Sequence, residues 1–395
     1  MTPVSPIAEQ LFSTLGNRLN SYAGLSTATL SQGINLYQSG DYEGSIREFK
    51  RTISLDPYSE NSIRAYDFMA QAFLKLNRVA DAIKTYQEAM KVFPQDDTLH
   101  LKLGNIYYHE ERYYEAEIEY KKAVRLNPSS ENLYSLGQVY LSTERYKEAE
   151  ETFQRILRSE PDNYGAHYSL GQVYAKQGLH GEAIKRFKET IKRKWDFAYA
   201  YYDLGMVYAD TGNFDGAEEQ IKILEDLNKD LAGELRAYLY KVKRPGIKFV
   251  NTSHAFNMKQ GPHTPVSSLS PELSTPGASK EMSIIVFFDK PMDRLSVENI
   301  ANWSIGRTTS LSQGGPYNWG LPIPDTEVKI NPLPQLVIYD ATTYSARVYF
   351  RITQNSTGDG TIDPSHIVFR FTGKDAYGNN MDPARDEYTG LSLIV

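Results

Sequence analysis

A period of about 34 residues runs through the first five-eighths of the chain, and this repeat restricts the fold more than any other feature. Each copy carries a small residue that is followed three positions later by a large apolar or aromatic one. Twelve positions after the first small residue a second one recurs, and a bulky residue stands four positions beyond it. The first small residues of the six copies are Gly33, Ala70, Gly104, Gly137, Gly171 and Gly205.

The bulky residues late in each copy indicate how such a unit folds. They are Phe49, Tyr86, Tyr120, Phe153, Phe187 and Ile221. Two amphipathic helices per copy explain the spacing, because a small residue on each helix lets the backbones approach while the bulky side chain fills the remaining gap. A proline closes each of the first four copies and would end the second helix. The pattern therefore predicts an array of stacked helical hairpins.

This pattern resembles the tetratricopeptide repeat family, most clearly in LKLGNIYYHEERYYEAEIEYKKAVRLNP and YSLGQVYLSTERYKEAEETFQRILRSEP. The resemblance covers residues 26–231 and implies six units that wind into an all-α, right-handed solenoid. The units are 26–59, 63–96, 97–129, 130–163, 164–197 and 198–231. Because the outer faces of terminal units lack a neighbour, segments 1–25 and 232–244 are expected to be capping helices. Either cap could instead dock on another copy of the protein.

The tetratricopeptide resemblance also implies a binding surface, since the first helix of each unit lines an inner wall that binds peptides or partner helices. The fifth and ninth residues of each unit would lie on that wall. The candidate binding residues are Gln71, Asn105, Tyr134, Gln138, Tyr168, Gln172 and Tyr202. Amides can bond both the N–H and the C=O of an extended chain, and tyrosine offers a rigid apolar face with a polar tip. Packing is the alternative role for each tyrosine, because many occupy core positions of the family.

After residue 244 the helical period stops and runs rich in β-branched and aromatic residues follow. They are IKFVN, SIIVFF, QLVIYD, ARVYFRIT, HIVFRFT and LSLIV. Residues 245–279, where Pro, Ser, Thr and Gly are frequent, predict a linker with a first strand. Residues 280–395 predict an all-β sandwich. The fold class expected for the whole chain is therefore multidomain α + β.

Two segments indicate a more specific β fold. IIVFFDKPMDRLSVENIANWSI resembles the strand, Pro-Met-Asp turn and asparagine-anchored continuation of immunoglobulin-like domains in bacterial surface-layer proteins and adhesins. GKDAYGNNMD resembles the late Asp-x-x-Gly-Asn turn of the same domains. The residues that carry the match are Pro291, Met292, Asp293, Asn302, Asp375, Gly378 and Asn379. The resemblance implies an immunoglobulin-like sandwich that serves as a spacer or adhesive module, although the insertion RTTSLSQGGPYNWGLPIPDTE departs from shorter members.

The composition limits the classes of partner and the cellular locations that can be expected for this protein. With 43 Lys+Arg against 49 Asp+Glu the chain lacks the cationic excess that releases phosphate counterions, so nucleic acid is not an expected partner. No apolar run is long enough to span a bilayer. The absence of cysteine excludes disulfides and thiolate metal sites. The first residues do not have the pattern of a secretory signal, which favours the cytoplasm. The surface-layer resemblance favours an extracellular or cell-surface location, and we prefer this second location.

No motif predicts catalysis, a metal or a cofactor, and the chain is not expected to be an enzyme. His109 lacks a second histidine on the same helical face. The loop from Asn355 to Asp363 looks like a calcium loop, but Thr357 is a poor third ligand and His366 stands where a bidentate carboxylate belongs. A simple turn is the favoured interpretation of that loop.

The leading hypothesis is a non-enzymatic protein-interaction scaffold or structural protein of the bacterial cell surface, with self-assembly into a filament or homo-oligomer as part of it. The first alternative is a soluble adaptor that binds a short peptide of a secretion or assembly partner in its groove. The second alternative is a glycan-binding adhesin, with Trp303 and Trp319 as candidate sugar platforms, although a core position is favoured for Trp303.

Overall fold

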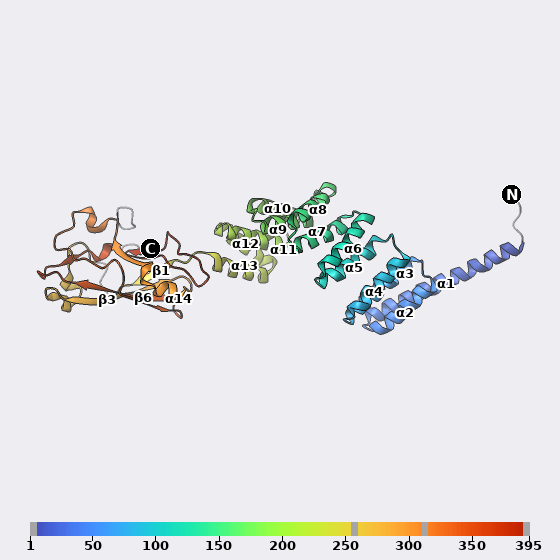
Figure 1. The fold of residues 1–395 in the computed structure, drawn as a ribbon, viewed down its shortest axis with the longest axis horizontal. Helices are drawn as coiled ribbons and strands as arrows, with labels where there is room; N and C mark the ends of the chain where they lie inside the picture. The colour runs from blue at the N-terminus through green and yellow to red at the C-terminus, as the bar shows by residue number, and fades with distance from the viewer. Residues whose placement is uncertain (1–5, 254–259, 310–314, 390–395) are drawn as a thin grey trace. The chain divides into compact units, whose positions relative to one another are not determined.

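The computed structural model describes residues 6–253, 260–309 and 315–389, with side chains from residue 21 onward (Figure 1). Backbone contacts divide the chain into two compact units. One contains residues 1–207 and 223–231, and the other contains residues 208–222 and 232–395. Among the residues described, none of the helices has the length and apolar character needed to cross a membrane.

The first part of the chain folds into consecutive helices that alternate with short turns, as the period predicts. The first hairpin is α1 (Pro6–Gln38) with α2 (Tyr42–Leu55), and the second is α3 (Glu60–Lys75) with α4 (Val79–Val92). The others are α5 (Asp97–His109), α6 (Tyr113–Leu126), α7 (Ser130–Ser142), α8 (Tyr146–Ser159), α9 (Tyr164–Lys176), α10 (His180–Arg193), α11 (Ala198–Asp210), α12 (Phe214–Leu227) and α13 (Lys229–Val242).

The N-terminal cap differs from its prediction. A separate capping helix was expected over residues 1–25, but α1 is one helix of 33 residues that continues into the first repeat unit (Figure 1). The reason lies in the sequence between residues 17 and 32, which contains no proline and only one glycine, Gly24. One glycine costs a helix about 1 kcal/mol and does not end it.

Glycine and aromatic side chains lock the two helices of a hairpin together. Phe153 on α8 is fully buried and its ring lies against Gly137 on α7, where an added Cβ would stand 2.6 Å from the ring. The same close approach joins Gly171 to Phe187, at 2.5 Å. Because real Cβ atoms do not approach that closely, the ring that covers Gly137 or Gly171 requires glycine at that position.

The turns inside the hairpins share one backbone feature. In each of the six hairpins the turn contains a residue in the left-handed region, with φ between 57° and 87°. These residues are Gly40, Asn77, Glu111, Glu144, Gly178 and Gly212. After this residue the chain bonds back to the first helix, as when the N–H of Arg112 donates to the C=O of Tyr107 at 2.8 Å.

The β region, defined as residues 245–389, contains two larger sheets and one strand pair. The strands are β1 (Ile247–Asn251), β2 (Thr264–Pro265), β3 (Ser279–Phe288), β4 (Trp303–Arg307), β5 (Leu336–Asp340), β6 (Ser345–Thr353), β7 (Thr361–Ile362), β8 (Ile367–Phe371) and β9 (Glu387–Thr389). The sheet orders are β1-β3-β6-β5, β4-β8-β9 and β2-β7, and every named pair is antiparallel. Short helices connect them: η1 (Val266–Ser268), η2 (Pro271–Ser274), α14 (Arg294–Glu298), η3 (Ile300–Asn302), η4 (Tyr317–Gly320) and η5 (Pro364–His366).

Side chains of both larger sheets form one hydrophobic core. The ring of Phe350 on β6 lies 5.3 Å from that of Phe369 on β8, and both are fully buried. Two described residues of the segment 245–279, which was expected to be a linker with a first strand, belong to this core, because Val266 and Leu273 are also fully buried. Five of the six predicted runs coincide with β1, β3, β5, β6 and β8, while LSLIV lies outside the described residues.

The two turns that carry the surface-layer resemblance lie next to each other. Met292 pairs with Asp375 in an antiparallel bridge. The N–H of Ala376 donates to the C=O of Pro291 at 3.1 Å, and the N–H of Asp293 donates to the C=O of Lys374 at 3.1 Å. Segments about 80 residues apart in the sequence therefore form one structural element.

A buried ion pair connects this element to the C-terminal end of α13. The ammonium of Lys290, 3% exposed, lies 2.6 Å from the carboxylate of Asp375, which is fully buried. Lys290 also donates to backbone carbonyls at the helix end, including that of Tyr240 at 3.1 Å. Asn379 donates to the carbonyl of Lys241 at 2.6 Å and to Asp375 at 2.9 Å. Cations stabilise the unpaired carbonyls of a helix C-terminus, so the β region caps α13.

Candidate protein-binding groove

The seven candidate binding residues lie on the first helices of their hairpins, as the repeat pattern predicts. Gln71 is on α3, Asn105 on α5, Tyr134 and Gln138 on α7, Tyr168 and Gln172 on α9, and Tyr202 on α11. Four of the seven line two separate hollows in the helical unit. Gln71 and Asn105 line the first, and Tyr134 and Tyr168 line the second.

The first hollow, of about 260 Å³, surrounds a carboxylate that is already fully engaged. Asp67 accepts hydrogen bonds from Tyr86 at 2.7 Å and from Gln71 at 3.0 Å, and it pairs with Lys102 at 2.6 Å. Burial and the charge of Asp67 raise the pKa of Tyr86. Asn105 accepts from Tyr120 at 2.7 Å and is exposed. These side chains hold one another in place, and the surface they present is polar.

The second hollow is larger, about 470 Å³, and we name it the aromatic hollow after the rings of Tyr134, Tyr164, Tyr168 and Phe197. The ring of Phe197 lies 4.9 Å from that of Tyr168 and 5.6 Å from that of Tyr164. Polar side chains complete the lining, namely Ser130, Glu131 and Asn163. A hollow with rigid aromatic walls and a few polar groups suits a bulky apolar side chain of a partner.

Gly165 keeps the aromatic hollow open. It lines the hollow as the second residue of α9, and an added Cβ would meet only the ring of Tyr134 at 3.5 Å and the amide of Asn163 at 3.4 Å. These are ordinary contact distances, so alanine would fit here, whereas a longer side chain would occupy the space itself.

Phe197 departs from the repeat at a position where the other units carry a helix cap. The side chains of Ser59, Asp96, Ser129 and Asn163 each accept a backbone N–H bond at the start of the helix that follows. Phe197 occupies the equivalent place before α11 and has no side-chain acceptor. Loss of a cap costs about 0.5–2 kcal/mol. Positions that break a local rule are often functional.

Gln138 and Gln172 lie one helical turn beyond Tyr134 and Tyr168, outside both hollows. Gln138 donates to Ser169 at 3.0 Å, and Gln172 donates to Tyr168 at 3.0 Å. Tyr168 in turn bonds Asp203, whose pKa is raised by burial. Both amide nitrogens are therefore engaged within the protein. Tyr202 lines neither hollow.

Sequence reasoning missed Tyr164, Phe197 and Asp203 in this groove. The signal for Phe197 was present, because an aromatic residue stands where four other units have Ser, Asp, Ser and Asn. Tyr164 opens its unit in a position that the wall pattern did not include. Asp203 contacts its partners from the neighbouring unit, and no spacing within one unit reveals that.

The two candidate tryptophans of the β region have opposite surroundings. Trp303 is a core residue and not a sugar platform, because it is 2% exposed and its indole N–H donates to the C=O of Val297 at 2.7 Å. Trp319 is 62% exposed.

In the calcium-like loop, Asp359 accepts from Asn355 at 2.8 Å, and Asp363 is buried against His366. The described residues contain no group of three or more side chains placed to hold a metal ion.

Comparison with known proteins agrees with the repeat assignment. Residues 69–131, 134–196 and 180–232 match the model of the tetratricopeptide repeat. A curated relative is the DnaJ homolog subfamily C member 7 homolog of Dictyostelium discoideum, 27% identical over 103 residues. That match covers 26% of this chain and 19% of the relative. The chain spans less than a third of the length of the curated relatives it matches.

Two solved structures align with about half of this chain. A tetratricopeptide repeat protein from Parabacteroides merdae aligns with a TM-score of 0.48 and 16% identity, over 55% of this chain and 88% of that one. The Pseudomonas aeruginosa protein pilF aligns with a TM-score of 0.45 and 19% identity, over 55% of this chain and 99% of that one.

Proposed function

We propose that this chain is a scaffold that holds an extended segment of another protein along its tetratricopeptide groove, with the aromatic hollow as the anchor point. The observation that carries the proposal is Phe197, which gives up a helix cap and contributes a ring to the hollow. Phe197 stands where a capping residue would stabilise the start of α11, and we attribute its presence there to binding.

The chemistry of the groove specifies the kind of segment. The aromatic hollow takes one bulky apolar side chain, and Glu131 on its lining favours a basic residue beside it. The carbonyl oxygens of Gln138 and Gln172 accept backbone N–H groups of the segment. An extended chain presents such groups at regular intervals, which a folded surface does not.

Replacing Phe197 with serine separates binding from stability. The substitution restores a cap at the start of α11 and removes the ring contacts with Tyr164 and Tyr168, so we expect the two effects to offset and the free energy of unfolding to change by at most about 1 kcal/mol. Peptide affinity is expected to fall about 30-fold or more, since aromatic anchors are typical binding hot spots. The measurement is to select short random peptides by display on the full chain and to titrate the enriched peptide by fluorescence anisotropy. A Phe197→Ser chain that loses stability and keeps its affinity would contradict the proposal.

A second pair of variants blocks the hollow without removing any ring. Gly165→Leu fills the hollow from within, and we expect it to abolish peptide binding while the helices remain folded. The matched control is Gly181→Leu, at the second residue of α10, where an added Cβ meets nothing within 4 Å. Equal affinities of these two variants, or a selection that enriches no common peptide pattern, would rule out the aromatic hollow as the anchor.

The wider parts of the sequence hypothesis stay predictions. They are the immunoglobulin-like assignment, the cell-surface location, and self-assembly into a homo-oligomer. One hypothesis combines these predictions: the protein is a surface scaffold in which the groove holds a partner and the β region acts as a spacer. Light scattering over a range of protein concentrations tests the self-assembly, because the mass of a monomer at every concentration excludes it.

A further inference from the structure

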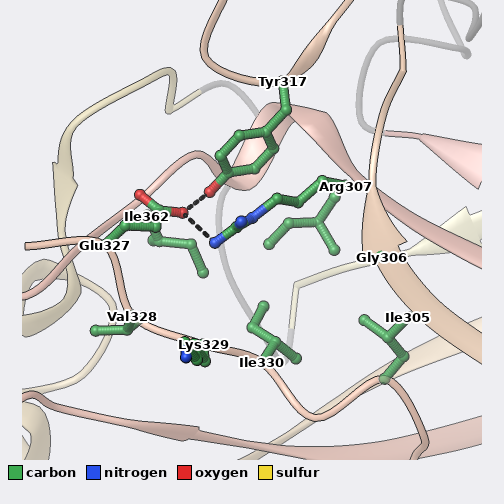
Figure 2. A pocket seen from close by; sticks show the side chains of 10 residues that line it. Ile305, Gly306, Arg307, Tyr317, Glu327, Val328, Lys329, Ile330 and Ile362 are labelled. Atoms are coloured by element: carbon green, nitrogen blue, oxygen red, sulfur yellow. Dashed lines mark hydrogen bonds and ion pairs between the residues drawn. The ribbon is translucent and has the colours of Figure 1, made fainter. Parts of the chain in front are cut away.

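The β region contains a cavity of about 360 Å³ that is separate from the groove (Figure 2). It lies beside β4, β7 and the segment 327–330 that precedes β5. Its lining includes five aliphatic residues, and we refer to them as the aliphatic wall: Ile305, Val328, Ile330, Ile362 and Ile367. A volume of this size lies at the lower end of the range for small-molecule sites.

Three polar side chains, those of Arg307, Tyr317 and Glu327, point toward one another in this cavity (Figure 2). The hydroxyl of Tyr317 donates to the carboxylate of Glu327 and accepts the N–H of Asp363 at 2.9 Å. The side chain of Glu327 is only 5% exposed. A guanidinium nitrogen of Arg307 lies 3.6 Å from the same carboxylate.

Arg307 is the group with unused binding capacity. Its guanidinium lies 5.0 Å from the centre of the Tyr317 ring, and its side chain is 40% exposed. The distance of 3.6 Å to Glu327 is longer than a hydrogen bond, and no other acceptor for Arg307 occurs in the described part of the chain. The planar guanidinium fork therefore holds N–H donors that face the cavity without an acceptor.

Glu327 sets the charge of the cavity. Burial raises the pKa of this carboxyl to about 7, Arg307 opposes the rise, and the negative charge of Asp363 adds to it. Asp363 is paired with His366 at 2.6 Å, and Lys329 is the remaining charged residue on the lining. Near neutral pH the cavity can therefore take up one proton at Glu327 when a second negative charge enters.

We propose that this cavity binds a small aliphatic carboxylate, with its carboxylate on Arg307 and its hydrocarbon chain on the aliphatic wall. Arg307 and a carboxylate form two parallel hydrogen bonds, which the long contact to Glu327 does not provide. Protonated Glu327 then donates to the bound anion instead of repelling it. A cationic ligand is disfavoured, because it would meet Arg307 at the mouth while Glu327 already accepts from Tyr317.

The test compares three probes of similar size and different charge: hexanoate, hexylammonium and hexanol. The isoleucines of the aliphatic wall serve as reporters through their methyl signals in NMR spectra of the full-length protein. We expect hexanoate to shift the methyl signals of Ile305, Ile330, Ile362 and Ile367 with a Kd on the order of 1 mM. Hexylammonium and hexanol are expected to leave these signals in place. Shifts with hexylammonium alone, or with none of the probes, would overturn the proposal.

Variants and pH separate the roles of the two charged groups. Arg307→Met is expected to abolish the shifts, whereas Arg370→Met, a change of an exposed arginine on β8, is expected to leave them intact. Hexanoate should bind about tenfold more weakly near pH 8 than near pH 6, because Glu327 must be protonated in the complex. Glu327→Gln should bind equally at both pH values. An affinity that rises with pH, or unchanged binding by Arg307→Met, would refute the assignment of the anion to Arg307.

Discussion

Replacing Lys290 with methionine is expected to lower the free energy of unfolding of the β region by about 3–5 kcal/mol. The substitution leaves Asp375 fully buried without its counter-charge and removes the donor to the carbonyls at the end of α13. Unfolding in urea, followed by tryptophan fluorescence, measures the effect. In a Trp195→Phe background the remaining tryptophans, Trp303 and Trp319, both report on the β region.

Two comparisons identify the buried charge as the cause. Lys280→Met removes an ion pair to Glu272 in which both side chains are well exposed, and it should cost at most about 1 kcal/mol. Adding Asp375→Asn to Lys290→Met should recover part of the loss, because no unpaired buried charge remains. If Lys290→Met and Lys280→Met unfold at the same urea concentration, the ion pair between Lys290 and Asp375 does not contribute the free energy of unfolding that we assign to it.

The same ion pair predicts sensitivity to acid. Burial opposes ionisation of Asp375, but hydrogen bonds from Asn379 and the charge of Lys290 outweigh it, and the pKa of Asp375 lies below its ordinary value of 3.8. This stabilisation is complete above the ordinary value and is lost as the pH falls through the lowered pKa. The free energy of unfolding of the Lys290→Met variant should therefore fall less between pH 5 and pH 2 than that of the unchanged protein, about the range in which Asp375 takes up its proton.

Truncating Phe153 to alanine is expected to lower the free energy of unfolding of the helical array by about 3–5 kcal/mol. The ring is fully buried between α7 and α8, and its removal leaves a cavity beside Gly137, which has no side chain to fill it. Because each hairpin stacks only on its neighbours, the weakened unit lowers the cooperativity of the array as well as its stability. Urea unfolding followed by far-UV circular dichroism measures both.

The contact between Phe153 and Gly137 predicts a change of sign in a double-mutant cycle. Gly137→Ala alone should destabilise by about 1–3 kcal/mol, because the new Cβ would collide with the ring. In the Phe153→Ala background the same change should stabilise by up to about 1 kcal/mol, the difference in helix propensity. Gly24→Ala, at a position in α1 with open space, should stabilise in both backgrounds. Additive effects would show that the ring does not require glycine.

The helical part of the fold was accessible from the sequence because its determinants are local and repeated. A small residue and a ring at fixed spacing encode each contact between α7 and α8 or between α9 and α10. The shared hollow of Tyr134 and Tyr168 has a sequence basis as well, since the two residues occupy the same position in consecutive units. The continuous α1 was accessible as well, because no helix breaker stands between residues 17 and 32, and the start of a repeat unit at residue 26 does not require a helix end.

The candidate sites depend on exceptions and on contacts between distant segments, which periodicity does not encode. Phe197 matters because it breaks the capping rule of the other units. The cavity of the β region joins Arg307 to Glu327 across a long insertion, and nothing in either local sequence indicates the other. The two turns around Met292 and Asp375 could be recognised as separate motifs, but only the fold shows that they meet.

The ion pair at the end of α13 affects the order in which the chain can mature. A chain leaves the ribosome N-terminus first, so α13 is complete before Lys290 and Asp375 have been synthesised. The β region therefore closes around a helix end that already exists. A fragment that begins at residue 245, where the helical period stops, lacks the carbonyls that Lys290 binds. A fragment designed to contain the folded β region should therefore begin before α13.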